Sequence, residues 1–237
     1  MIDLHYSDSW ADPEKQKKPA AWENHSFEQL VLDVYNYTLE VMNALKAKDV
    51  KPEWVQIGNE IPSGMLWPDG SIDNFEQLSK LLNSGYEAVK VIYNEAKVII
   101  HLDQGDDRER FIKFFDNHKA NGGKYDVIGV SYYPYWIEKD YTETIDNLSN
   151  NLIEFVSRYN KEVMVCEVGG EDTSVSNTYD MLKEVIKIVK SISDNKGLGV
   201  FYWEPEGAYN WSKYKLSAWG DDGRPTAALD AFLDSNS

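Results

Sequence analysis

Two glutamates, Glu60 and Glu167, each close a short apolar run in this chain of 237 residues. The first run reads Trp-Val-Gln-Ile-Gly-Asn-Glu over residues 54–60, and the second reads Val-Met-Val-Cys-Glu over residues 163–167. Short runs rich in Val and Ile that end in Gly, Asn or an acid are typical of buried strands whose last residue emerges at the carboxyl edge of a sheet. α/β folds place their chemistry at that edge. Two carboxylates there can supply the acid and the nucleophile that cleave a glycosidic bond.

Polar and aromatic residues beside these acids fit the same chemistry. Asn59 directly precedes Glu60, and a side-chain amide in that place can hydrogen-bond a sugar 2-hydroxyl. Tyr132 or Tyr133, after another apolar run, could hydrogen-bond the nucleophile and orient it. Trp203 ends the last apolar run and can form a floor for a sugar ring. Packing in the core or at the rim is the alternative role for each of them.

Histidine and cysteine usage argues against a metal centre. His5, which lies near Asp8 and Trp10 at the end of the first apolar run, could be a ligand, but the four histidines are scattered without ligand spacing. A polar contact to sugar hydroxyls fits His5 better. The single cysteine, Cys166, excludes an intrachain disulfide and a cysteine-rich metal site. We expect no metal and no cofactor.

Strand and helix patterns alternate along the whole chain. We expect strands over residues 1–6, 54–60, 98–101, 126–131, 163–167 and 199–203, with amphipathic helices between them and a closing helix over residues 226–233. Strict alternation without a linker predicts one α/β domain covering residues 1–237. No Gly-rich phosphate turn is present, which favours a (β/α)8 barrel over a doubly wound sheet. Six strand–helix units are two short of that barrel.

The amino-acid composition limits the classes of molecule that the protein is expected to bind. The formal net charge of −16 opposes binding to nucleic acid or anionic lipid, and a neutral substrate fits it better. No apolar run approaches the roughly 20 residues that cross a bilayer, so we expect no membrane insertion. Met1 leads directly into Ile2 and Asp3, and no signal peptide is visible.

Several stretches together resemble glycoside hydrolase family 53, the arabinogalactan endo-β-1,4-galactanases of the large retaining (β/α)8 clan. The most specific are Asp-Leu-His-Tyr-Ser-Asp-Ser-Trp-Ala-Asp-Pro over residues 3–13 and Val-Gln-Ile-Gly-Asn-Glu over residues 55–60. The others are residues 15–22, 66–70, 128–136, 165–169 and 200–205, in family order across the chain. The Asn-Glu pair alone would indicate only the clan.

The resemblance implies a function and a site. Glu60 would be the acid/base on the fourth barrel strand of the family, and Glu167 the nucleophile on the seventh. The implied substrate is β-1,4-galactan of pectic type I arabinogalactan, cut internally with retention of configuration. The implied location is secreted or periplasmic. The residues that we assign to substrate binding are His5, Asp8, Trp10, Asn59, Tyr132, Tyr133, Trp136 and Trp203.

The sequence also departs from the family pattern. It begins inside the third family strand, so the first two strands and an arginine that supports the nucleophile are not in it. A calcium-binding insertion of some bacterial relatives is missing, and Ser9 replaces a large aromatic residue. We favour an amino-terminally incomplete fragment over a natural truncation or an inactive relative. Exposed strand edges should make the isolated chain poorly stable or prone to associate.

Two other functions fit the same residues. Another retaining β-glycanase of the clan, such as a mannanase or a glucanase, would use the same pair of acids. A non-catalytic polysaccharide-binding protein would keep the aromatic residues but lack support for its nucleophile.

Overall fold

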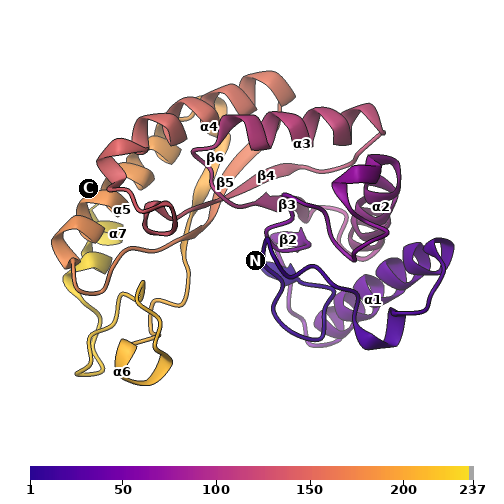
Figure 1. Cartoon of the computed structure of the whole chain (residues 1–237), viewed down its shortest axis with the longest axis horizontal. Helices are drawn as coiled ribbons and strands as arrows, with labels where there is room; N and C mark the ends of the chain where they lie inside the picture. Colours follow the sequence, from indigo (N-terminus) through magenta and orange to yellow (C-terminus); the bar gives the residue numbers. More distant parts are fainter. Residues whose placement is uncertain (235–237) are drawn as a thin grey trace. The chain divides into compact units, whose positions relative to one another are not determined.

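The computed structural model describes residues 1–234, which form two compact units (Figure 1). The first unit comprises Met1–Asp103 and Glu109–Ile128, and the second comprises Gln104–Arg108 and Gly129 onwards. Each unit is described by itself below.

Parallel strands and helices alternate along the described chain. Its six strands are β1 (Ile2–Leu4), β2 (Trp54–Ile57), β3 (Lys97–Leu102), β4 (Val127–Tyr132), β5 (Glu162–Val168) and β6 (Gly197–Tyr202). Each strand neighbours the next one along the chain, and β4 begins in the first unit and ends in the second. The pairs β1–β2, β2–β3 and β5–β6 are parallel. The carboxyl ends of parallel strands lie at the same edge of a sheet, and chemistry in α/β folds is usually found at that edge.

Helices connect the strands. The longer ones are α1 (Phe27–Ala47), α2 (Phe75–Ile92), α3 (Arg108–Ala120), α4 (Ile145–Tyr159) and α5 (Val175–Ser191), and the short α6 (Tyr209–Ser212) and α7 (Asp230–Asp234) follow β6. Single 3-10 turns are η1 (Ala20–Trp22), η2 (Ile72–Asn74), η3 (Pro134–Ile137), η4 (Tyr141–Glu143), η5 (Ser193–Asn195) and η6 (Ala227–Leu229). Among the described residues, no helix has both the length and the apolar character needed to cross a membrane.

In the first unit, α1 and α2 lie side by side (Figure 1). The buried face of α1 carries Leu30, Val34 and Thr38 at four-residue steps, as an amphipathic helix requires. Ser26 caps α1 by accepting from the Gln29 N–H at 3.3 Å, and Asn74 caps α2 in the same way. The Gln29 side-chain amide donates to Asp33 Oδ1, one turn further along α1, at 2.9 Å.

In the second unit, α4 and α5 pack on β5, and α5 also packs on β6. Leu148, Leu152 and Phe155 of α4 are fully buried, and Leu182 and Val185 of α5 repeat the pattern. The core is therefore continuous from the strands to the helices that follow them.

The strand boundaries differ from the expected ranges by one to three residues. Two of these differences concern the glutamates. Glu167 lies inside β5, which continues through Val168, and Glu60 lies three residues beyond the end of β2. One acid therefore belongs to a strand and the other to the turn after a strand.

Candidate functional site

In the first unit, Glu60 stands on an irregular turn that follows β2. The turn begins at Gly58, whose φ is +80° and whose N–H donates to the Leu4 carbonyl at 2.9 Å. A Cβ at position 58 would lie 2.9 Å from Ile61 Cγ2, so both the backbone conformation and the packing require glycine. Glu60 is half-buried and also has a positive φ, of 43°. The Ile61 N–H donates to the His101 carbonyl at 3.0 Å, which ties the end of the turn to β3.

Asn59, the residue before the candidate acid, is the centre of a buried hydrogen-bond network. Its Nδ2 donates to the Ala11 carbonyl at 2.9 Å. Its Oδ1 accepts from Gln56 Nε2 at 2.9 Å and lies 3.0 Å from His101 Nδ1. Gln56 Nε2 also donates to Asp3 Oδ1 at 2.8 Å. The amide orientation is fixed by these partners, because Gln56 presents a donor and needs an acceptor opposite.

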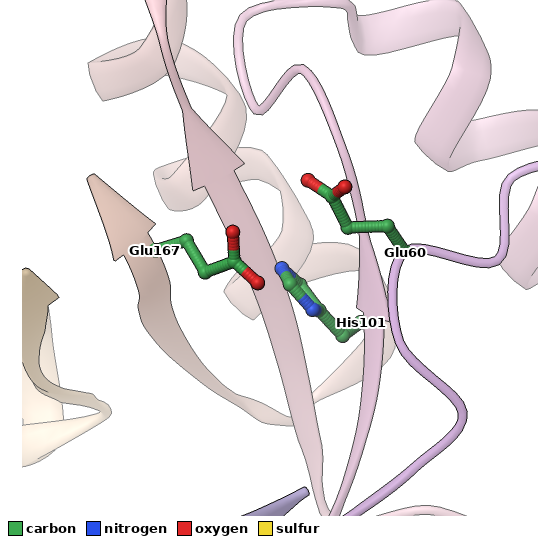
Figure 2. Close-up of side chains that lie close together, drawn as sticks. All are labelled: Glu60, His101 and Glu167. Carbon is green, nitrogen blue, oxygen red and sulfur yellow. The ribbon is translucent and has the colours of Figure 1, made fainter. Parts of the chain in front are cut away.

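His101 lies on β3 close to Glu60. Both belong to the first unit, their ligand atoms lie within 4.8 Å of each other, and Figure 2 shows the two side chains. The ring is fully buried, and burial together with nearby His5 lowers its pKa to about 3. His101 is therefore neutral at ordinary pH and donates from Nδ1 to Asn59. Glu60 and His101 are potential metal ligands by residue type, and the absence of a metal stays a prediction.

The loop after β1 holds the other predicted residues of the first unit. His5 uses both ring nitrogens, since Nδ1 accepts from the Ala11 N–H at 2.7 Å and Nε2 lies 3.0 Å from Asp3 Oδ2. Asp8 accepts from the Ala20 N–H at 2.7 Å. His5 and Asp8 thus shape the loop. Trp10 is 67% exposed, with Lys15 Nζ 4.8 Å from its ring centroid and a side-chain hydrogen bond to Asp12, so much of its indole surface is accessible.

In the second unit, Glu167 is held by a tyrosine. The Tyr133 hydroxyl, just beyond β4, donates to Glu167 Oε2 at 3.0 Å, and the Glu167 side chain is drawn in Figure 2. Glu167 is only 7% exposed, and a hydrogen bond donated to a buried carboxylate stabilises its charged form. Tyr214 hydrogen-bonds Tyr133 in turn. Burial raises the pKa of the Tyr214 hydroxyl, the Tyr133 bond opposes that rise, and nearby Glu167 adds to it.

The choice between the two tyrosines is decided by burial. Tyr132 is fully buried, and its hydroxyl lies 2.8 Å from Thr144 Oγ1, at the start of α4. The assignment of Tyr132 to substrate binding is therefore corrected, because a side chain enclosed between strand and helix cannot touch a polysaccharide. Tyr133, the next residue, faces Glu167.

Two predicted tryptophans of the second unit are accessible. Trp203 directly follows β6, is 37% exposed, and donates its backbone N–H to the Val168 carbonyl at the end of β5. Trp136 is 60% exposed and lines a pocket of about 620 Å³. Gly169 and Asn177 lie on the other side of the same pocket. Both tryptophans thus offer an aromatic face near the strand ends, as sugar binding requires.

Sequence reasoning missed three residues that the structure brings to the Glu60 turn. They are Gln16, Gln56 and His101, and each is less than 3% exposed. A polar residue inside an apolar strand run, such as Gln56 or His101, is a signal that could have been used, because buried polar groups need partners. Gln16, in a polar loop, gave no such signal.

Comparison with known proteins identifies the family. The model of glycosyl hydrolase family 53 matches residues 1–232. The chain belongs to this family. It is 37% identical to the arabinogalactan endo-β-1,4-galactanase A of Aspergillus niger over 228 residues, which are 86% of this chain and 63% of that protein. The expected family is therefore confirmed, and the chain spans about two thirds of the length of the curated relatives that it matches.

Solved structures of family 53 proteins share the fold. A fungal β-1,4-galactanase superposes with a TM-score of 0.87 at 31% identity, covering 98% of this chain and 76% of the other. The family 53 catalytic domain of Ignisphaera aggregans gives the same TM-score at 32% identity, covering 98% and 72%. The expected α/β class with six strand–helix units of the family barrel is confirmed.

Proposed function

We propose that the protein containing this chain hydrolyses β-1,4-galactosidic bonds of pectic galactan internally and with retention. Glu60 acts as acid/base and Glu167 as nucleophile. The observation that carries the proposal is that a family 53 chain has one glutamate three residues beyond the end of β2 and another at the penultimate residue of β5. In retaining glycosidases the two carboxyl groups lie about 5–5.5 Å apart. We expect that separation in the complete protein.

The local settings support this division of roles. A nucleophile must be ionised, and Glu167 accepts a hydrogen bond from the Tyr133 hydroxyl, which favours the carboxylate. A general acid must carry a proton at the start of the reaction. Glu60 has as its neighbour a histidine whose lowered pKa, about 3, leaves it uncharged, so that ring adds no positive charge that would hold Glu60 ionised.

The remaining groups suit a neutral, extended saccharide. Asn59 uses one Nδ2 hydrogen on Ala11, and its second can reach a sugar 2-hydroxyl. Trp10, Trp136 and Trp203 expose 67%, 60% and 37% of their surface, and pyranose rings pack their C–H faces on indoles. The secreted or periplasmic location stays a prediction from the family.

The test uses the full-length protein with linear β-1,4-galactan. Proton NMR of the first products should show the β-anomer before mutarotation, because retention conserves configuration. Glu60→Gln and Glu167→Gln should each lower kcat/KM by about 1000-fold or more. Matched controls are Glu53→Gln and Glu162→Gln, which lie at the amino ends of the same two strands and should keep near-normal activity.

Three results would contradict the proposal. An α-anomer as first product would exclude retention. Near-normal turnover by Glu60→Gln or Glu167→Gln would remove the assignment of that residue. Binding of galactan without any product, or cleavage of mannan or glucan in place of galactan, would replace the function with one of the other two considered above.

A further inference from the structure

The backbone of Glu60 is unusual for an acid with a chemical task. Its φ of 43° lies in the left-handed region, where L residues with side chains are uncommon, and it is not followed by a regular element. Such a conformation persists only when the surroundings over-determine it. Contacts that hold this backbone therefore also decide where the carboxyl group points.

Gln16 makes the contacts that hold it. The side chain is 2% exposed and comes from the loop after β1. Its Nε2 donates to the Asn59 carbonyl at 2.7 Å and to the Glu60 carbonyl at 3.1 Å, and it also lies 3.0 Å from the Asp12 carbonyl. Three acceptors around one nitrogen fit only the donor end of the amide, so the orientation of Gln16 is unambiguous.

Gln16 is itself fixed in place. Its backbone carbonyl accepts from the Trp67 N–H at 2.8 Å, and the turn that leads to it is closed by the Lys15 N–H on the Asp12 carbonyl at 3.0 Å. On the other side of Glu60, the Ile61 N–H donates to the His101 carbonyl. The peptide groups before and after the Glu60 side chain are thus anchored by two different segments of the first unit.

We propose that Gln16 is a positioning residue for Glu60. It fixes the left-handed turn and so sets the direction in which the acid/base carboxyl group meets the leaving oxygen. This inference rests on the proposed role of Glu60. Gln16 touches no reacting atom, and its effect should therefore be confined to the step that needs the proton of Glu60.

The leaving group of the substrate separates this role from a general structural one. A sugar alcohol leaves only when it is protonated, whereas 2,4-dinitrophenolate leaves without help from an acid. Gln16→Met keeps the length and the bulk of the side chain and removes its donor. We expect kcat/KM on galactan to fall about 10- to 100-fold, and kcat/KM on a 2,4-dinitrophenyl β-galactobioside to fall less than about 3-fold.

A matched control is Asn151→Ala in the second unit. Asn151 is also a buried amide, 4% exposed, whose Nδ2 donates to a loop carbonyl, that of Gly105, at 2.9 Å. Asn151→Ala should lower kcat/KM on the two substrates by the same factor, or leave both values unchanged. Equal losses on the two substrates for Gln16→Met, or no loss at all, would overturn the positioning role.

A second measurement does not depend on activity. A crystal structure of full-length Gln16→Met should show Glu60 outside the left-handed region, and a Glu60 backbone unchanged from φ 43° would overturn the proposal. If the wild-type protein cleaves neither substrate, the proposed function fails, while this structural comparison still decides the role of Gln16.

Discussion

Glu60 in the first unit belongs to an irregular turn, whereas Glu167 in the second unit belongs to strand β5. The turn has no ladder of hydrogen bonds of its own, so distant segments supply the anchors, Gln16 from one side and His101 from the other. Strand β5 pairs with β6 on both sides of Glu167, at Val165 and at Val168, with a shift of register between these two residues. There the Tyr133 hydroxyl donates to the carboxyl group and helps to orient it.

This difference indicates which substitutions should disturb the position of each acid. Glu60 depends on many residues that never approach a substrate, because its position is a property of the whole turn. Glu167 lies within a strand and accepts a hydrogen bond from the Tyr133 hydroxyl. Substitutions around Glu60 should therefore have larger and more varied effects than substitutions around Glu167.

After the two glutamates, the largest effect is expected for Asn59→Ala. The variant loses contacts with Ala11, Gln56 and His101, and the proposed bond to the sugar 2-hydroxyl. We expect kcat/KM on galactan to fall about 100- to 1000-fold. For comparison, Tyr133→Phe in the second unit loses one hydrogen bond to a carboxylate and should cost about 10- to 100-fold.

A 2-deoxy substrate tests the sugar contact itself. If Asn59 binds the 2-hydroxyl, removing that hydroxyl should slow the wild type by a larger factor than it slows Asn59→Ala. The two factors are measured as ratios of kcat/KM, so electronic effects of the 2-deoxy group cancel. Identical ratios would show that Asn59 only supports the turn.

Local sequence predicted the elements and the two acids, but not the network between them. The strands, the Ser26 and Asn74 caps and both glutamates follow from short-range patterns. Gln16 and His101 reach the Glu60 turn through contacts between residues about 40 positions apart, which no local pattern encodes. Tyr132 and Tyr133 are identical in type and adjacent, so only the strand's orientation could tell which one is buried.

The next prediction concerns the stability of the first unit in acid. This unit contains every histidine of the chain. His118 is fully buried between Phe114 and Tyr125, with its Nδ1 2.9 Å from Ser79 Oγ. Burial lowers its pKa from 6.5 to about 4. Between those two values the unfolded chain binds a proton that the folded chain does not bind, so stability falls as pH falls.

The expected loss for His118 is up to about 3 kcal/mol on going from pH 7 to pH 4, and none is added below that. His101, with its pKa lowered to about 3, acts in the same direction. Urea unfolding at several pH values should show the loss, and His118→Gln, which keeps a polar group beside Ser79, should flatten the curve between pH 6.5 and 4. An unchanged slope in that variant would exclude His118. Segment-resolved hydrogen exchange should place the acid-induced opening in α2 and α3, not in the helices of the second unit.

The smallest effect distinguishes two helix starts, one in each unit. Ser26 accepts a hydrogen bond from the Gln29 N–H at the start of α1, whereas Ser174, at the start of α5, makes no side-chain cap among the described residues. Ser26→Ala should therefore lower the free energy of unfolding by about 1 kcal/mol. Ser174→Ala should change it by less than about 0.5 kcal/mol, because the half-buried Ser174 side chain makes no cap that the substitution would remove. Equal losses in urea unfolding would mean that both serines cap their helices in solution, and the contrast between the two units would not extend to their helix ends.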